Sequence, residues 1–189
     1  MNERKKVELQ ITSLSNSQTE AGAFIMVLSE AGTQRNLPIA IGASEAQAIL
    51  FELRGVNTPR PLTHVLFASV MIALGIRLLR VVIYKVENGV FYSYLYIRSN
   101  EVILRVDSRT SDAVALALRM KAPILTYEDI LNEDHTPAPD IHGGETYTSS
   151  STGNAAWLKE ALQKAIEQED YEQAAVLRDQ LNHLQQTKS

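Results

Sequence analysis

Two stretches of the chain hold side chains that could act on a phosphorylated substrate. They lie at residues 37–66 and 106–121, where carboxylates, cations and hydroxyls are set among apolar residues. A histidine titrates near neutral pH and a guanidinium binds phosphate oxygens, so together they could support acid–base chemistry on a phosphate ester. The candidates are Glu45, Arg60, Thr63 and His64 in the first stretch and Asp107, Arg109, Ser111 and Asp112 in the second.

For several of these residues a structural role competes with a chemical one. Glu45 could act as a general base, or it could interact with the dipole at the start of a helix. His64, the only histidine before residue 135, could transfer protons or simply pack in the first turn of a helix. Arg60 stands between two prolines, which could aim its guanidinium at a phosphate or at an internal carboxylate.

A metal site is a further possibility that the spacing does not identify. Glu45, Asp107 and Asp112 could together hold Mg²⁺ or Mn²⁺, which phosphodiester hydrolysis often requires. No tight ligand spacing such as HxxxH or DxD occurs, so the metal stays unknown. Arg109 and Ser111 at a helix start would form an anion pocket, with a salt bridge to Glu45 as the alternative for Arg109. The chain has no cysteine, which excludes thiol catalysis and zinc–thiolate sites.

The elements that position the first stretch are three strands and two helices. Alternating or continuous apolar residues predict strands at 6–14, 23–28 and 37–41, and Pro38 favours an edge or a bulge for the third. Ser44 and Gln47 match a capping box and Gly55 a helix stop, which predicts a helix over Ser44–Arg54. A second helix is predicted from Pro61 or Thr63 to Leu74.

The second stretch follows a predicted hairpin. Asn88-Gly89 favours a two-residue turn between strands at 76–87 and 90–99. That register pairs Tyr84 with Ser93 and sets a tyrosine row on the face opposite Tyr84; the row is Tyr92, Tyr94 and Tyr96. The row could stack bases, but a subunit interface is the favoured interpretation. A strand at 101–107, a buried helix at 112–121 and a short strand at 124–125 follow.

These elements predict an α+β domain over residues 1–131, with a mixed, largely antiparallel sheet of about six strands flanked by helices. Residues 132–153 are rich in Pro, Gly, Ser, Thr and Asp and are expected to form a flexible linker. Residues 154–189 carry two apolar stripes at helical spacing, which predicts a C-terminal helical hairpin. A hairpin this short buries little surface, so it is expected to pair with a protein partner or another copy.

The charge is divided between the two parts. Residues 1–131 hold 14 basic and 12 acidic residues, and the remainder holds 4 and 10, so neither part is a broad basic field. The N-terminus has no apolar run that would make a signal peptide, and the run at 65–76 is too short to span a bilayer. We therefore expect a cytoplasmic protein without a membrane partner.

Three motifs resemble the bifunctional nuclease (BFN) domain family. They are LPIAIGASEAQAI at 37–49, GVNTPRPLTHVL at 55–66 and DSRTSDAVALALR at 107–119, and the resemblance spans residues 7–131. It implies an α+β fold, assembly into dimers or higher oligomers, and cleavage of both DNA and RNA. Thr110 stands where the family usually has proline, which removes one rigid element from that helix start.

Residues 158–184, with EDYEQAAVLRDQL at 169–181, resemble the UVR motif. That motif is the helical hairpin by which the excision-repair proteins UvrB and UvrC contact each other. The resemblance implies protein–protein contact and does not imply a role in repair.

Together these observations give a first hypothesis and a rival. The first is a low-specificity nuclease that hydrolyses phosphodiester bonds of DNA and RNA, with a C-terminal interaction hairpin. Its catalytic residues would be Glu45, His64, Asp107 and Asp112, and its substrate-binding residues Arg60, Thr63, Arg109 and Ser111, converging in one pocket. The rival is a non-catalytic, homo-oligomeric binding module that recruits a partner through the hairpin, so whether the protein is an enzyme stays open.

Overall fold

The computed structural model describes residues 4–17 and 23–133, with six more positions at 162, 163, 166, 174, 175 and 178. The chain divides into two compact units, Met1–Val56 with Pro61–Tyr147 and Asn57–Arg60 with Thr148–Ser189. The six C-terminal positions are all helical. The rest of the predicted hairpin, and the predicted linker beyond residue 133, lie outside the described residues, so the domain bounds stay predictions.

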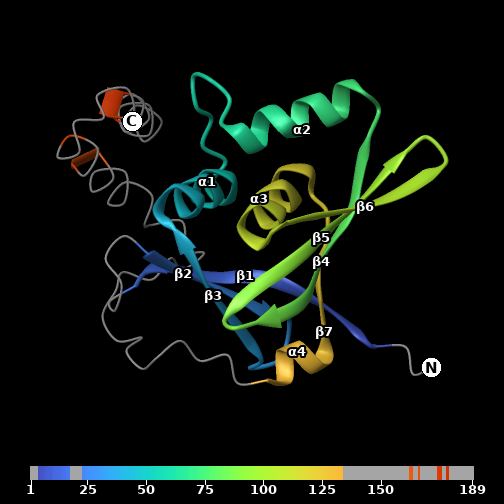
Figure 1. Ribbon diagram of the computed structural model, residues 1–189. Helices are drawn as coiled ribbons and strands as arrows, with labels where there is room; N and C mark the ends of the chain where they lie inside the picture. Colours follow the sequence, from blue (N-terminus) through green and yellow to red (C-terminus); the bar gives the residue numbers. More distant parts are fainter. Residues whose placement is uncertain are drawn as a thin grey trace. The chain divides into compact units, whose positions relative to one another are not determined.

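The first unit is built on one seven-stranded sheet with the order β3-β2-β1-β7-β4-β5-β6 (Figure 1). All neighbours are antiparallel except β7, which runs parallel to β4. The predicted α+β class with a mixed, largely antiparallel sheet is therefore confirmed. The strands are β1 Lys6–Asn16, β2 Ala23–Glu30, β3 Asn36–Gly42, β4 Arg77–Glu87, β5 Val90–Ser99, β6 Val102–Arg109 and β7 Ile124–Tyr127.

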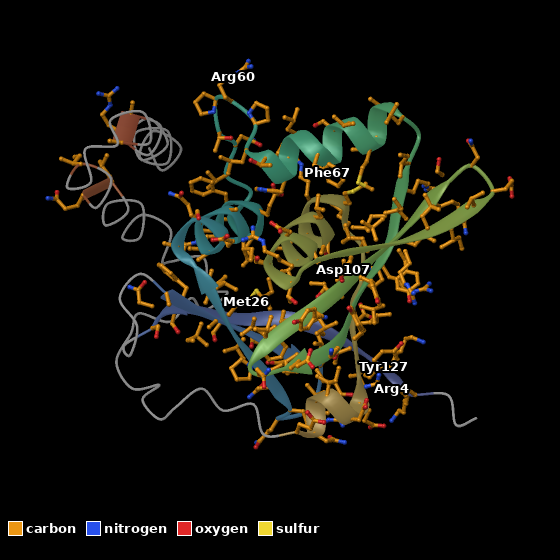
Figure 2. The ribbon with its side chains drawn as sticks, viewed as in Figure 1. Arg4, Met26, Arg60, Phe67, Asp107 and Tyr127 are labelled. Carbon is orange, nitrogen blue, oxygen red and sulfur yellow. The ribbon has the colours of Figure 1, made fainter. Side chains whose placement is uncertain are left out.

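The N-terminal half of the sheet follows the apolar pattern closely. β3 lies at the edge, where Pro38 needs no ladder hydrogen bond on its outer side. β2 lies between β1 and β3, and its Met26 and Leu28 are fully buried (Figure 2). The predicted strand at 23–28 is thus confirmed, and it lies in the interior of the sheet.

Within residues 4–17 and 23–133, four helices accompany the sheet: α1 Ala43–Arg54, α2 Thr63–Ala73, α3 Thr110–Met120 and α4 Glu128–Asn132. α3 packs on β4, β5 and β6, and α1 packs on β2 and β3. α1 and α2 both contact α3 (Figure 1). The run from Ala113 to Ala117 is fully buried, because α3 is enclosed by the sheet on one side and by the other two helices on the other.

The start of α1 differs from the predicted capping box. The helix begins at Ala43, with Gly42 as its N-cap and no side-chain cap, so Ser44 lies inside the first turn. Ser44 Oγ instead donates a hydrogen bond to Glu45 Oε2 at 3.0 Å. The Glu45 carboxylate folds back over Gly42, where an added Cβ would lie 2.5 Å from Oε2. The capping box was therefore wrong, while the helix and its stop at Gly55, with φ of 64°, are confirmed.

The β4–β5 hairpin has the predicted turn but a different register. Asn88 and Gly89 have φ of 51° and 76°, as a primed turn requires. Beyond Lys85, however, Ser93 pairs with Ile83 and not with Tyr84. The extra residue is a β-bulge, which reverses the alternation of the preceding side chains as far as a second register shift between Leu78 and Arg80.

The bulge changes which β4 side chains share a face with the tyrosine row. Val81 and Ile83 pair with Leu95 and Ser93 and are completely buried beneath the helices. Tyr84 joins the tyrosine row of β5 on the opposite side of the sheet. The predicted partition of β4 between the two faces was therefore wrong.

Candidate active site

Helices α1 and α3 lie side by side in parallel, with ionic contacts near both ends of the pair. Near their starts Glu45 of α1 contacts Arg109, the N-cap of α3. Seven residues beyond Glu45 and Asp112, Glu52 and Arg119 face each other in the same way. Seven helical residues advance about 10.5 Å, so two separate polar clusters lie along one helix pair.

The cluster at the helix starts, here called the arginine cluster, consists of Glu45, Arg109 and Asp112. Arg109 NH1 donates to Glu45 Oε1 at 2.8 Å. Its Nε and NH2 donate to the two oxygens of Asp112 at 2.8 and 3.1 Å, a bidentate fork. The Arg109 side chain is 66% exposed, so a large substrate can reach it.

The arginine cluster keeps its charges at neutral pH. The pKa of Glu45 is lowered mainly by the hydrogen bond that the Glu45 backbone N–H donates to the carboxylate. Partial burial raises this pKa, and hydrogen bonds from Ser44 and Arg109 lower it further. Asp112, first by hydrogen bonding and then by its charge, raises the pKa of Arg109, and Glu45 adds to that effect. Glu45 is therefore an ionised carboxylate held close to a guanidinium.

The donor set does not fit a divalent cation in this arrangement. Both Asp112 oxygens and Glu45 Oε1 accept hydrogen bonds from Arg109, and Glu45 Oε2 accepts one from Ser44. The guanidinium thus occupies the position between the carboxylates that a metal ion would need. Across the part of the chain that the structure describes, no three His, Asp or Glu side chains gather around one point.

His64 lies in the second cluster and not beside Glu45. Its Nε2 is 3.1 Å from Glu52 Oε1, and the two side chains are only 9% and 12% exposed. Arg119 NH1 lies 3.8 Å from the other oxygen of Glu52. The pair links the first turn of α2 to α1 near the helix ends remote from the arginine cluster.

Sequence reasoning did not identify Glu52. The available signal was spacing: Glu52 follows Glu45 by seven residues, and Arg119 follows Asp112 by seven. Residues seven apart lie on the same side of a helix, so the two parallel helices can repeat an ionic contact.

The remaining candidates divide among other surroundings. Asp107 is exposed on β6 and accepts a hydrogen bond from Tyr84 Oη at 3.3 Å. Thr63 is exposed as the first residue of α2, whereas Ser111 is buried in the first turn of α3. Arg60 belongs to the second unit, where its carbonyl accepts a hydrogen bond from Thr58 Oγ1 at 2.6 Å, and its predicted role stays a prediction. The expected convergence is thus found for Glu45, Arg109 and Asp112, while His64 and Asp107 have other partners.

Comparison with known proteins adds a family to this geometry. Residues 26–139 match the model of the bifunctional nuclease domain, and residues 158–187 match the UvrB/uvrC motif. An uncharacterized protein of Mycobacterium tuberculosis H37Rv is 40% identical over 138 residues, which cover 73% of this chain and 82% of that protein.

Two plant relatives carry a nuclease name. Bifunctional nuclease 1 of Oryza sativa subsp. indica is 27% identical over 177 residues, covering 83% of this chain and 53% of that protein. A bifunctional nuclease of Oryza minuta is 27% identical over 129 residues, covering 67% and 39%. The matched domain range includes all three residues of the arginine cluster.

Proposed function

Because the chain belongs to the bifunctional nuclease domain family, we propose that it hydrolyses phosphodiester bonds of DNA and RNA at the arginine cluster. The observation that carries the proposal is the exposed guanidinium of Arg109, held by two carboxylates within the family's domain. A guanidinium fork recognises phosphate oxygens in the same bidentate geometry in which it binds Asp112.

In the proposed reaction, the phosphodiester competes with Glu45 for Arg109. When Arg109 turns to the phosphate, Glu45 loses one of the contacts that lower its pKa and becomes a better proton acceptor. The oxygen of a water molecule then bonds to phosphorus, and its proton passes to Glu45. The P–O bond to the leaving nucleotide breaks, and the leaving oxygen takes a proton from solvent.

The proposal gives other predicted residues supporting roles. His64 positions α2 against α1 through Glu52, and its burial keeps the imidazole away from a polymeric substrate. Asp107 orients Tyr84. Arg60 and Thr63 stay predicted substrate contacts.

The test uses extensively purified protein and end-labelled single-stranded DNA and RNA, with and without a chelator. Glu45→Gln is expected to lose most hydrolysis of both substrates. Glu101→Gln, which removes an exposed carboxylate in the β5–β6 turn, is the matched control and should cleave like the wild type. Equal cleavage by wild type, Glu45→Gln and Glu101→Gln would identify a contaminant and end the proposal.

We also propose that copies of the chain assemble through exposed apolar surfaces rather than through the tyrosine row. Exposed apolar side chains occur on and after α2 and along β6, the outermost strand of the sheet among the described residues. Such surfaces and open strand edges are usual sites of subunit contact. The residues are Leu66, Phe67, Val70, Ile72 and Leu74 near α2, and Val102, Leu104 and Val106 on β6 (Figure 2 labels Phe67).

The C-terminal motif supports a second, separate function, which is the recruitment of a protein partner in the cytoplasm. The match to the UvrB/uvrC motif at 158–187 is the observation that favours it. Deletion of residues 154–189 should abolish partner capture and leave the sheet domain folded. Capture that persists after the deletion would show that another surface recruits the partner.

Among the residues that the structure describes, no helix has the length and apolar character to cross a membrane.

A further inference from the structure

The side of the sheet that faces away from α1 and α3 carries a tyrosine face, defined as Tyr84, Tyr92, Tyr94 and Tyr96. The rings of Tyr84 and Tyr94 stack with centroids 3.8 Å apart and an interplanar angle of 7°. Tyr92 lies 6.3 Å from Tyr84 at a tilt of 58°. All four side chains are partly exposed, so the stacked rings form an accessible surface.

Cations alternate with these rings. The guanidinium of Arg80 lies 4.4 Å from the centroid of Tyr96, and that of Arg105 lies 4.5 Å from the centroid of Tyr94. Lys85 Nζ is 5.3 Å from the centroid of Tyr92. Each tyrosine of β5 therefore has a positive charge beside its ring.

The face continues toward β7 and the N-terminal residues. Arg4 lies with its guanidinium 4.0 Å from the centroid of Tyr127 (Figure 2). Arg4 NH1 also donates to the Tyr84 carbonyl at 3.5 Å, which joins this fourth cation–ring pair to the tyrosine face.

Two carboxylates on the face are already engaged. Glu87 pairs with Lys85 at 2.5 Å, and Asp107 accepts the hydrogen bond from Tyr84. Arg80 and Arg105 form no ion pair with any carboxylate among the described residues. Their guanidinium groups are thus available to an external anion.

The strand register connects this face to the arginine cluster. Tyr96, Tyr94 and Tyr92 pair in turn with Arg105, Asp107 and Arg109. Arg109 is the last residue of β6, about 14 Å along the strand from Arg105 at the usual rise per residue. Its guanidinium turns toward the starts of α1 and α3, so a polymer that follows β6 would reach the arginine cluster at the end of the strand.

We propose that this surface binds single-stranded nucleic acid, with bases stacked on the tyrosine and guanidinium planes and phosphates on Arg80 and Arg105. Alternating aromatic rings and cations match a chain of alternating base planes and phosphates. A duplex keeps its base planes stacked inside, so the rings select unpaired strands. Interface cores between subunits are depleted of charge, which argues against a second copy as the occupant. The delivery of the strand to Arg109 rests on the proposed function, whereas the binding itself does not.

The test measures fluorescence anisotropy of a labelled oligothymidylate in chelator, with wild type and two variants. Tyr96→Leu keeps an apolar side chain and removes one stacking surface, so the dissociation constant should rise about 5- to 100-fold. Arg105→Gln removes one phosphate contact, so the slope of log K against log salt should become shallower by about 0.7. A duplex of the same length should bind more weakly than the single strand.

A matched control comes from the helix side of the same domain. Lys121→Gln removes an exposed cation after α3 and should bind like the wild type. Weakening by Lys121→Gln equal to that of Arg105→Gln would overturn the proposal, as would no binding by the folded wild type.

A second measurement uses the wild type alone and so does not depend on a variant that folds. Ultraviolet cross-linking to an oligonucleotide with 5-bromouracil should place adducts on the peptide that contains Tyr92, Tyr94 and Tyr96. Adducts confined to α2 would refute the proposal. So would a Tyr96→Leu variant whose oligomer dissociates while its oligonucleotide binding is unchanged. Oligonucleotide binding without hydrolysis would refute the proposed function and leave the binding surface standing. Hydrolysis that is unaffected by Tyr96→Leu and Arg105→Gln would refute the binding surface and leave the proposed function standing.

Discussion

Replacing Arg109 by glutamine should separate the activity of the arginine cluster from the stability of the fold. Arg109 makes three charged hydrogen bonds, yet its side chain is 66% exposed. Exposed ion pairs contribute roughly 0.2–1 kcal/mol each because water screens them. The two pairs with Glu45 and Asp112 therefore give a total of about 1 kcal/mol, which corresponds to a decrease in Tm of about 5 °C or less.

The expected effect on activity is much larger. A group that stabilises charge at the reacting centre commonly contributes about 100- to 1,000-fold to the rate, equivalent to roughly 2.7–4 kcal/mol. We expect kcat/KM of Arg109→Gln to decrease by at least about 100-fold on both DNA and RNA. Arg109→Lys keeps the charge and loses the planar fork, so its rate should lie between those of the wild type and the glutamine variant.

The assay is continuous cleavage of quenched fluorescent single-stranded DNA and RNA, run beside thermal unfolding by circular dichroism. Arg119→Gln is the matched control, because Arg119 lies near the other end of the helix that Arg109 caps, contacts Glu52 at 3.8 Å and is 42% exposed. It should show a similar small change in Tm and no change in rate. A folded Arg109→Gln variant that cleaves at the wild-type rate, or an Arg119→Gln variant that loses as much, would refute the assignment of the site.

Three further predictions concern the Glu52–His64 pair, the Glu45 carboxylate and the exposed surface of α2. Glu52→Ala leaves the buried imidazole of His64 without its partner, so the free energy of unfolding in urea should decrease by about 1–3 kcal/mol while cleavage per folded molecule is retained. The pKa of Glu45 is lowered in the folded state, so the stability that its ionised form contributes is complete above the ordinary carboxyl pKa of 4.5 and is lost as pH falls through the lower native pKa. The difference in Tm between wild type and Glu45→Gln should therefore shrink in acid. A difference in Tm that grows in acid would contradict this prediction. Ile72→Asp places a charge on the exposed aliphatic surface of α2 and should reduce the mass measured by light scattering to that of one chain, whereas an unchanged oligomer would exclude α2 from the contact.

Local sequence signals predicted most of the secondary structure. Asn88-Gly89, Gly55 and Pro38 each impose a backbone requirement that a few neighbouring residues satisfy, so the hairpin, the helix stop and the edge strand were all predictable. The bulge at Tyr84 was not predictable, because it depends on how the whole face of β4 packs under α3. A single extra residue there decides whether Tyr84 or Ile83 lies in the core.

The candidate site was predicted in its composition but only partly in its grouping. Glu45, Arg109 and Asp112 meet as the two motifs suggested, because each motif places its charged residues at the start of a helix and the two helices pack together. The separation of His64 from them could not be derived, because it depends on where α2 crosses the helix pair. That crossing is set by tertiary packing and not by any residue near His64 in the sequence.

The position of β7 has a consequence for how the domain is completed during synthesis. Among the described residues β7 is the last strand, and it has only four residues, yet it lies between β1 and β4 in the middle of the sheet. Until residues 124–127 have left the ribosome, the antiparallel groups β1-β2-β3 and β4-β5-β6 have no strand to join them, and each exposes an open edge. A chain that ends within α3 therefore lacks the one strand that pairs with both β1 and β4, so the sheet can be completed only after residues 124–127 are made.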